Sequence, residues 1–167
     1  MNPLIKSFHL TQKVFAMESK LSKTIIGGLA GFWMMSLIMK YTVPMMVGQS
    51  INFAALLGSL IGGVYEIGLV IHVLLGVLVF PLVYACLLFR FLPGVPLVKG
   101  LLFGQMLWLI TATMVMPMTG IGFFMTEIGG IKVALAALVS YWIYGALLGG
   151  IAGNLHTNQR NIAERPA

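Results

Sequence analysis

Acidic residues are almost absent from this chain. Its 167 residues include no aspartate and only four glutamates, and charged residues of both signs make up 8% of the total. A soluble domain needs about a quarter of its residues charged. Hydrophobic residues make up 59%, and the mean hydropathy is +1.00. A chain of this length cannot bury so much apolar surface in its own core, so we expect lipid to cover the remainder.

Cysteine is equally scarce, and the single one, Cys86, lies in an apolar stretch. A lone cysteine forms no internal disulfide and behaves as a small hydrophobic residue. The net charge of +6 raises the question of nucleic acid. The basic residues, however, stand at the ends of apolar runs and form no cluster with interleaved aromatics. Such placement is typical of topology signals and lipid headgroup contacts, so we expect no nucleic-acid partner.

Four apolar segments are long enough to cross a bilayer, which takes about 20 residues of helix. They cover about residues 24–47, 66–91, 97–119 and 131–154. The first is too long for a cleavable signal peptide, so we expect it to remain as an anchor. The sequence therefore predicts an all-α membrane protein with a four-helix bundle over residues 24–153.

Three shorter segments flank these spans. Residues 1–23 carry lysines seven apart and an apolar face, which favours an amphipathic helix in the headgroup layer; a frayed basic tail is the alternative. Residues 50–63 are too short to span and predict an interfacial or re-entrant helix. Residues 154–167 are polar, and we expect a loosely ordered cytoplasmic tail.

The basic residues are distributed unevenly between the two sides of this arrangement. Cytoplasmic segments of membrane proteins carry an excess of Lys and Arg. The side that holds the termini carries Lys6, Lys13, Lys20, Lys23, Arg90, Lys99, Arg160 and Arg165. The other side carries Lys40 and Lys132. Eight against two predicts that the N- and C-termini are both cytoplasmic.

The second half of the chain looks like a copy of the first. A shift of 73 residues lays the first span on the third, with Gly27 on Gly100. A shift of 60 residues lays the second span on the fourth, with Tyr84 on Tyr144. We interpret the halves as two duplicated helical hairpins. His72, the one histidine set inside an apolar run, has no counterpart in this repeat.

Several short motifs carry a resemblance to a known family. They are the G-x-x-x-G at the start of the first span, Ile71-His72 with Gly76, Tyr84-Ala85, the run L-P-G-x-P-x-x-K-G-L-L-F-G from Leu92 to Gly104, and Met116-Pro117-Met118. Over about residues 24–153 the chain resembles a family of small four-helix bacterial inner-membrane proteins of unknown function. The resemblance implies a multi-pass inner-membrane protein and leaves its activity open.

His72 is the first candidate for a functional residue, because an isolated polar group inside a span is costly. A proton-relay, metal or haem-axial role would each suit a neutral imidazole. The alternative is a packing role, in which His72 hydrogen-bonds a neighbouring helix. The side chains that offer such a bond are Ser36, Gln105, Thr111 and Thr113.

Methionines form the second candidate group. Met45 and Met118 lie near the ends of the first and third spans, on the same side of the membrane as His72. Thioethers and an imidazole are ligands that a soft Cu(I) ion accepts, which makes these three residues a candidate metal site. Methionine is also a common gap-filler in apolar packing, and that is the alternative role.

Glycines spaced four apart recur along the spans. In lipid such small residues let helices approach closely. The helix-packing candidates are Gly27, Gly31, Gly100, Gly104, Gly145, Gly149 and Gly153. Their number exceeds the evident needs of one four-helix core, which favours association with further helices, in a homo-oligomer or as an accessory subunit of a membrane complex.

The sequence offers no constellation for catalysis and no cofactor motif. It contains no recognisable nucleophile–base pair, phosphate loop or closed metal cluster. We therefore expect a non-enzymatic multi-pass protein of the bacterial inner membrane, with lipids and other membrane subunits or copies of itself as partners. The alternative is a small transporter or metal-handling protein that uses His72 and the outer methionines.

Overall fold

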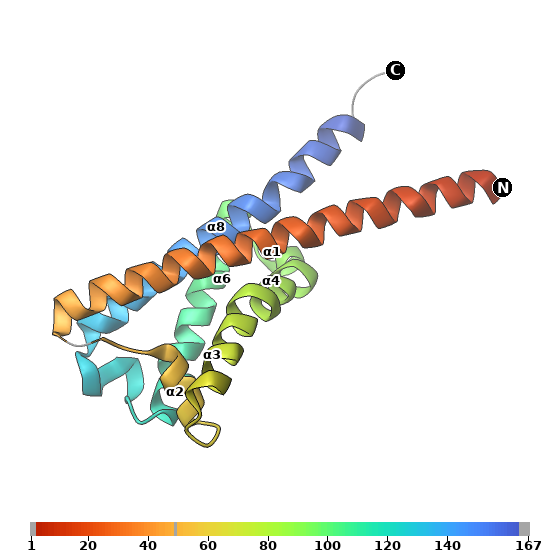
Figure 1. The fold of residues 1–167 in the computed structure, drawn as a ribbon. Coiled ribbons are helices and arrows are strands. Elements are labelled where there is room, and N and C mark those ends of the chain that lie inside the picture. The colour runs from red at the N-terminus through yellow and green to blue at the C-terminus, as the bar shows by residue number, and fades with distance from the viewer. Residues whose placement is uncertain (1–2, 49, 164–167) are drawn as a thin grey trace.

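The computed structural model describes the backbone of residues 3–48 and 50–163, and the side chains of residues 21–48 and 50–153. All elements in these residues are helical, and no strand is present among them (Figure 1). Four of the stretches described there are long and apolar enough to cross a membrane. They are Leu21–Val47, Tyr65–Phe91, Pro96–Met118 and Ile131–Gly153. The prediction of an all-α fold with four spanning helices is confirmed.

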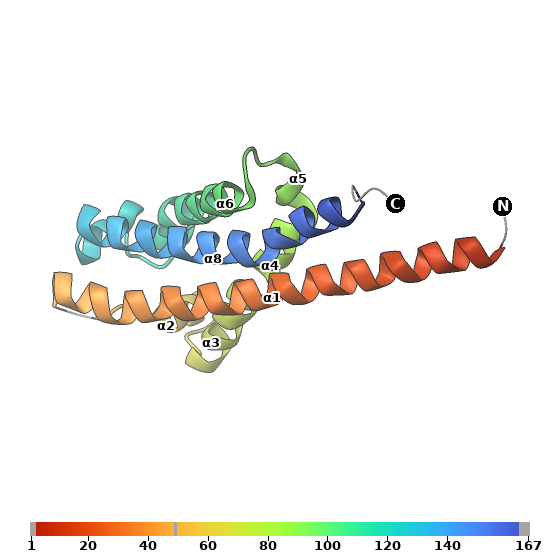
Figure 2. The ribbon, with the colours of Figure 1, turned by 90° about the horizontal axis from the view of Figure 1, so that it is seen from above.

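The first and last spans pack along each other in opposite directions. They belong to α1 (Pro3–Val47) and α8 (Ile131–Ala163), and α6 (Pro96–Ile110) packs against α8 as well. Figure 2 shows α8 between α1 and α6. The most extensive helix contacts thus meet on α8, and half of the residues in its most apolar stretch are buried.

Glycines bring these three helices close together. Gly27 and Gly31 lie against the α8 backbone, and Gly100 lies against Gly145 and Gly149, so an added side-chain carbon would crowd the neighbouring helix. In lipid, close van der Waals packing of this kind replaces the hydrophobic effect as the cause of helix association. All the glycines predicted to pack helices lie at contacts inside this one chain: Gly27, Gly31, Gly100, Gly104, Gly145, Gly149 and Gly153.

The second span is one helical path that contains two widened turns. It consists of α3 (Tyr65–Leu74), the π-helical turn η1 (Leu75–Val79), α4 (Phe80–Val83), the π-helical turn η2 (Tyr84–Leu88) and α5 (Phe89–Phe91). In the third span α6 continues through the π-helical turn η3 (Thr111–Val115) into α7 (Met116–Met118). The 3-10 helix η4 (Phe123–Ile128) then leads to α8. π-Helical turns are rare, and they occur frequently at functional sites.

Prolines account for two of the widened turns. η1 begins six residues before Pro81, and η3 begins six residues before Pro117. A proline has no N–H, and its ring clashes with the carbonyl four residues earlier, so the helix must widen or kink to continue. In a π-helical turn a carbonyl bonds to the N–H five residues later, which for Gly76 would be Pro81. The hydroxyl of Tyr144 donates to this carbonyl instead, at 2.8 Å.

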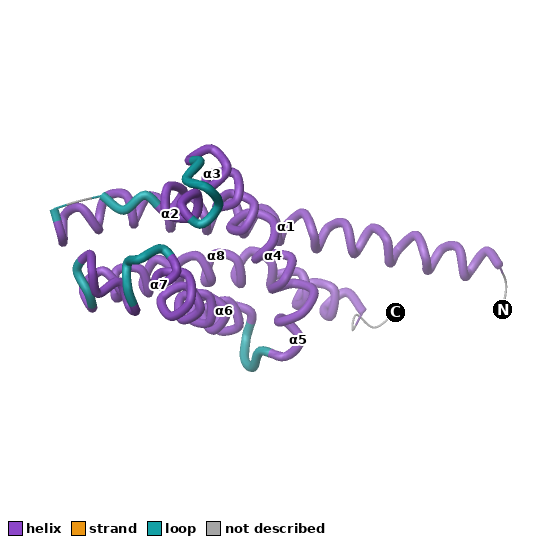
Figure 3. Tube along the Cα trace, turned by 90° about the horizontal axis from the view of Figure 1, so that it is seen from below, coloured by secondary structure: helices purple, strands orange, loops and turns teal. Residues whose placement is uncertain are grey.

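A short helix folds back on the second span. α2 (Phe53–Ser59) begins after Asn52, whose side-chain oxygen accepts a hydrogen bond of 3.1 Å from the backbone N–H three residues later, as a helix N-cap does. Gly58 of α2 lies directly against Gly68 of α3. The segment 50–63, predicted as an interfacial or re-entrant helix, thus packs beside α3, on the flank of α1 away from α8 (Figure 3).

The first and last helices extend beyond their spans, which differs from the sequence-based expectation. α1 runs without a break from Pro3. Of the segment 1–23, predicted as a headgroup-layer helix or a frayed tail, the described residues 3–23 therefore continue the axis of the first span (Figure 1). α8 continues to Ala163 through most of the segment 154–167, predicted as a loosely ordered tail. No proline stands at either boundary, and a helix continues through polar residues where nothing breaks it.

The basic residues separate between the two ends of the bundle. The N-terminal part of α1, the C-terminal part of α8 and α5 lie at one end (Figure 2), and Arg90 and Lys99 belong to this end. Lys40 and Lys132 belong to the other end, where α1 finishes and α8 begins. Both described chain ends are therefore on the same side of the bundle.

Candidate functional site

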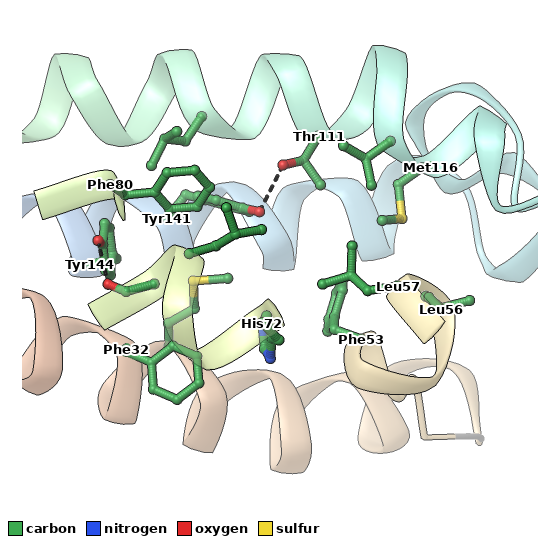
Figure 4. A pocket seen from close by; sticks show the side chains of 15 residues that line it. Phe32, Phe53, Leu56, Leu57, His72, Phe80, Thr111, Met116, Tyr141 and Tyr144 are labelled. Carbon is green, nitrogen blue, oxygen red and sulfur yellow. Dashed lines mark hydrogen bonds between the residues drawn. The ribbon is translucent and has the colours of Figure 1, made fainter. Parts of the chain in front are cut away.

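His72 lies on α3 between α1 and α2 (Figure 4). Its imidazole meets Phe32 of α1 edge to face, with the ring centroids 5.1 Å apart. On the other side it stacks with Phe53 of α2, with centroids 6.1 Å apart and planes inclined by 24°. Aromatic contacts of this kind contribute about 0.5–1.5 kcal/mol each beyond area burial. Two phenyl rings from different helices therefore fix the position of the imidazole.

A hydrogen bond to a neighbouring helix does not explain His72. Three of the predicted partners bond elsewhere: Thr111 with the hydroxyl of Tyr141 at 2.8 Å, Gln105 with the indole of Trp142 at 3.0 Å, and Thr113 with the carbonyl of Leu109 at 2.7 Å. Among the described side chains His72 itself makes no hydrogen bond, and no buried side-chain nitrogen or oxygen there lacks a partner. The ring nitrogens of His72 consequently border open space.

One open space beside His72 is a partly enclosed pocket of about 80 Å³ inside the helix bundle, called the internal cavity. Apolar side chains form most of its wall, with Phe80 and Met116 among them (Figure 4). Its hydroxyl groups already have partners, since Tyr141 pairs with Thr111. A buried water needs about 10–15 Å³ of such space and two to four polar partners. The cavity therefore has room for several small groups, and its wall favours hydrocarbon over water.

The other open space is a cleft of about 580 Å³ between α1, α2 and α3. Ser36, Lys40 and Asn52 line it together with Tyr65, so its wall is more polar than that of the cavity. Its volume lies within the range of about 300–1,000 Å³ that is usual for ligand sites. Trp33, which also lines the cleft, is 61% exposed on a spanning helix, so the cleft opens toward the lipid.

Four side chains separate the cleft from the internal cavity. Phe32, Met35, Phe53 and His72 line both spaces, and His72 is the polar member of the four. It lies seven residues after Tyr65, the first residue of α3, about 10 Å along the helix from that end of the span. These four side chains therefore form the boundary that the two spaces share.

Lys40 is the cation of the cleft. It lies seven residues before the end of α1, about 10 Å along that helix, at a depth similar to that of His72. Its ammonium lies 5.9 Å from the ring centroid of Tyr41, and no carboxylate pairs with it among the described residues. From the sequence alone, Lys40 is a topology signal. The signal for its second role was its spacing of four from Ser36, which puts both side chains on one face of α1.

The structure does not bring the predicted metal-site residues together. Met45 and Met118 are 88% and 69% exposed, and neither lines a space that His72 borders. Met35 and Met116 line the internal cavity with His72 instead. Nowhere in the described chain do three or more His, Cys, Asp or Glu side chains gather around a point that could hold a metal. A copper site at His72 would thus need thioethers other than the predicted pair.

Comparison with known proteins identifies one family. Residues 18–163 match a family of unknown function, DUF6789. The matched region includes all four spans, the cleft and the cavity. No curated protein and no solved structure matches the chain. A function therefore has to be argued from the geometry around His72.

Proposed function

The chain belongs to the family of unknown function DUF6789, and from its structure we propose that it is a non-enzymatic multi-pass membrane protein that binds a small hydrophobic molecule taken from the lipid. The observation that carries this proposal is the pair of spaces around His72. A lipid-facing cleft of about 580 Å³ and an apolar cavity of about 80 Å³ meet at one imidazole.

The groups that line the two spaces support binding more than catalysis. They include one imidazole, one amine, hydroxyls and an amide, and neither lining contains a carboxylate or a thiol. Nucleophilic catalysis usually pairs the nucleophile with a base within hydrogen-bond reach. His72 has no such partner among the described side chains.

Native mass spectrometry of the protein extracted gently from its own membrane tests this function. We expect the wild type to carry added mass from a small molecule. In His72→Ala, the fraction of protein that carries this molecule should fall at least sixfold. Val70→Ala is the matched control, because Val70 lies on the same helix, is 56% exposed and lines neither space. No added mass in the wild type, or equal occupancy in all three proteins, would refute ligand binding at this site.

Association with other subunits is the second candidate function. The abundance of glycines no longer supports it, because all seven lie at contacts inside the chain. The second span supports it instead, since it has the highest mean hydropathy of the four, 2.5, and only 17% of its most apolar stretch is buried. Such a face is available to lipid or to another helix.

Cys86 provides a direct test of self-association through this span, because it is exposed and is the single cysteine of the chain. We expect oxidation in native membranes to produce a disulfide-linked dimer that Cys86→Ser abolishes, if copies meet along the second span. A chain that stays monomeric after oxidation argues against that arrangement. Other subunits that co-purify with it would identify the protein as an accessory component.

The bacterial inner membrane with both termini in the cytoplasm is the location that we propose. The excess of basic residues supports this orientation, because the chain ends, Arg90 and Lys99 share one end of the bundle and Lys40 and Lys132 belong to the other. A green fluorescent protein fused after the last residue should then fluoresce, and alkaline phosphatase at the same position should be inactive. The opposite pair of results would invert the orientation.

A further inference from the structure

The cleft contains a positive charge with no counter-charge. Lys40 lies about 10 Å inside the end of its helix, and neither the cleft nor the adjoining cavity is lined by a carboxylate. Charged groups at membrane depth usually pair with an opposite charge or a polar group, because they are costly to leave alone. Ser36 and Ser50 also line the cleft. An ammonium with hydroxyl donors in the same cleft is suited to bind an anion.

The opposite end of the site is suited to hydrocarbon. Beyond His72 the cavity is walled mainly by apolar side chains, including Phe80, Leu107 and Val115. Its Tyr141 and Thr111 hydroxyls are bonded to each other and Tyr144 is bonded to Gly76, so a polar guest would find few free partners. An apolar chain gains from leaving no void and needs no partner.

The two spaces also differ in size. The cleft measures about 580 Å³ and the cavity about 80 Å³. The larger and more polar space is therefore at the Lys40 end, and the smaller and more apolar space lies on the other side of His72. This difference in size and polarity matches a molecule with one acidic head and one hydrocarbon chain.

We propose that the ligand is an anionic single-chain amphiphile, whose acidic head lies beside Lys40 and whose chain passes His72 into the internal cavity. The inference rests on the proposed ligand-binding function and adds the chemical class of the ligand. A carboxylate head, as in a fatty acid, and a phosphate head, as in a lysophospholipid, share the chemistry that Lys40 would recognise. Entry is lateral, because the mouth of the cleft faces the lipid at Trp33.

Binding of defined probes to the full chain tests the ligand class. The protein is purified in dodecyl maltoside, an uncharged detergent, and titrated with oleate, oleoyl lysophosphatidylglycerol and uncharged oleyl alcohol, with bound mass read by native mass spectrometry. We expect saturable one-to-one binding of at least one anionic probe, at least tenfold tighter than that of oleyl alcohol. The stronger of the two anions identifies a carboxylate or a phosphate as the preferred head.

Two lysine variants separate specific recognition from general attraction of anions. Lys40→Gln should weaken the anionic probe at least tenfold and leave oleyl alcohol unchanged. Lys132→Gln is the matched control, because it removes the same charge at the same end of the bundle but lies outside the cleft, and it should bind as the wild type does. Both lysines are exposed, so neither change should disturb folding.

The outcomes distinguish the ligand class from the broader function. If the anions bind no better than oleyl alcohol, or if both lysine variants weaken them equally, the anionic amphiphile is excluded. Should His72→Ala still remove a native ligand in that case, ligand binding at the cleft stands with a different, uncharged ligand. Should no probe bind and no native mass be lost, both proposals fall.

Discussion

The two flanks of α1 are packed by different means. Toward α8, glycines bring the helix backbones together; toward α2 and α3, the rings of Phe32, Phe53 and His72 meet and line two open spaces. Half of the most apolar stretch of α8 is buried, against 17% for the second span. The difference teaches that stripes of small residues specify the fold of this protein, whereas the isolated polar residue in a span locates the site.

One hydrogen bond connects the two regions. Tyr144 of α8 donates to the carbonyl of Gly76, which Pro81 leaves without a partner in its own helix. Gly76 lies against Phe32, and both Gly76 and Tyr144 line the internal cavity. Tyr144 of α8 therefore holds the widened turn η1, which borders the internal cavity.

The largest effect is expected from enlarging a glycine at a close helix contact. Gly149→Leu should destabilise the protein by more than about 3 kcal/mol, because a side chain there collides with the backbone of Pro96 and Gly100. Gly150→Leu, at the next residue, should leave stability unchanged, since nothing lies within 4 Å of that position. Thermal unfolding in detergent and the monodisperse peak in size exclusion measure both. Equal losses for the two variants would contradict the packing of α6 on α8.

A smaller effect is expected from removing the bond between the two regions. Tyr144→Phe deletes one hydroxyl and leaves the Gly76 carbonyl unpaired in an apolar setting, which should cost about 1–2 kcal/mol. Tyr41→Phe makes the same chemical change at a side chain that is 61% exposed, and it should cost nothing measurable. Unfolding in a graded denaturing detergent compares the pair, and a cost as small for Tyr144 as for Tyr41 would mean that the bond contributes no stability.

The smallest effect tests whether Pro81 causes the widened turn η1. Pro81→Ala restores an N–H that can bond within the helix, so Tyr144→Phe should cost about 0.5–1 kcal/mol less in that background than in the wild type. Loss of the proline ring beside Gly28 cancels in the double-mutant cycle, because it is common to both arms. Strictly additive costs would show that the proline and the tyrosine act independently.

Much of the fold could be predicted from hydropathy, since four long apolar stretches have few alternatives to four spans. The helix against which each row of glycines packs could not be predicted. Gly27 and Gly100, aligned by the internal repeat, both pack on α8, and glycines of α6 face glycines of α8. All seven glycines serve two helix interfaces, α1 on α8 and α6 on α8, so their number does not require further helices, and association with further helices stays a prediction. The internal repeat itself stays a prediction.

The site was predictable in one residue and unpredictable in its surroundings. His72 stood out because a polar residue inside a span is unusual. Phe53 comes to it through the return of α2 onto α3 at Gly58, and Lys40 lines the same cleft from α1. No periodicity within a single helix encodes that return. The exposed methionines were chosen for chemistry alone, and their side chains face away from the imidazole's two spaces.

α1 is an unbroken helix that is much longer than the membrane is thick. Its 45 residues extend about 68 Å, against about 30 Å of hydrocarbon. The part of α1 within the span carries Phe32 and Lys40 in the wall of the cleft. The part from Pro3 to Lys20 continues about 27 Å past the start of the span. A tilt of α1 at the cleft wall would therefore move its amino-terminal end as well, because both lie on one unbroken helix.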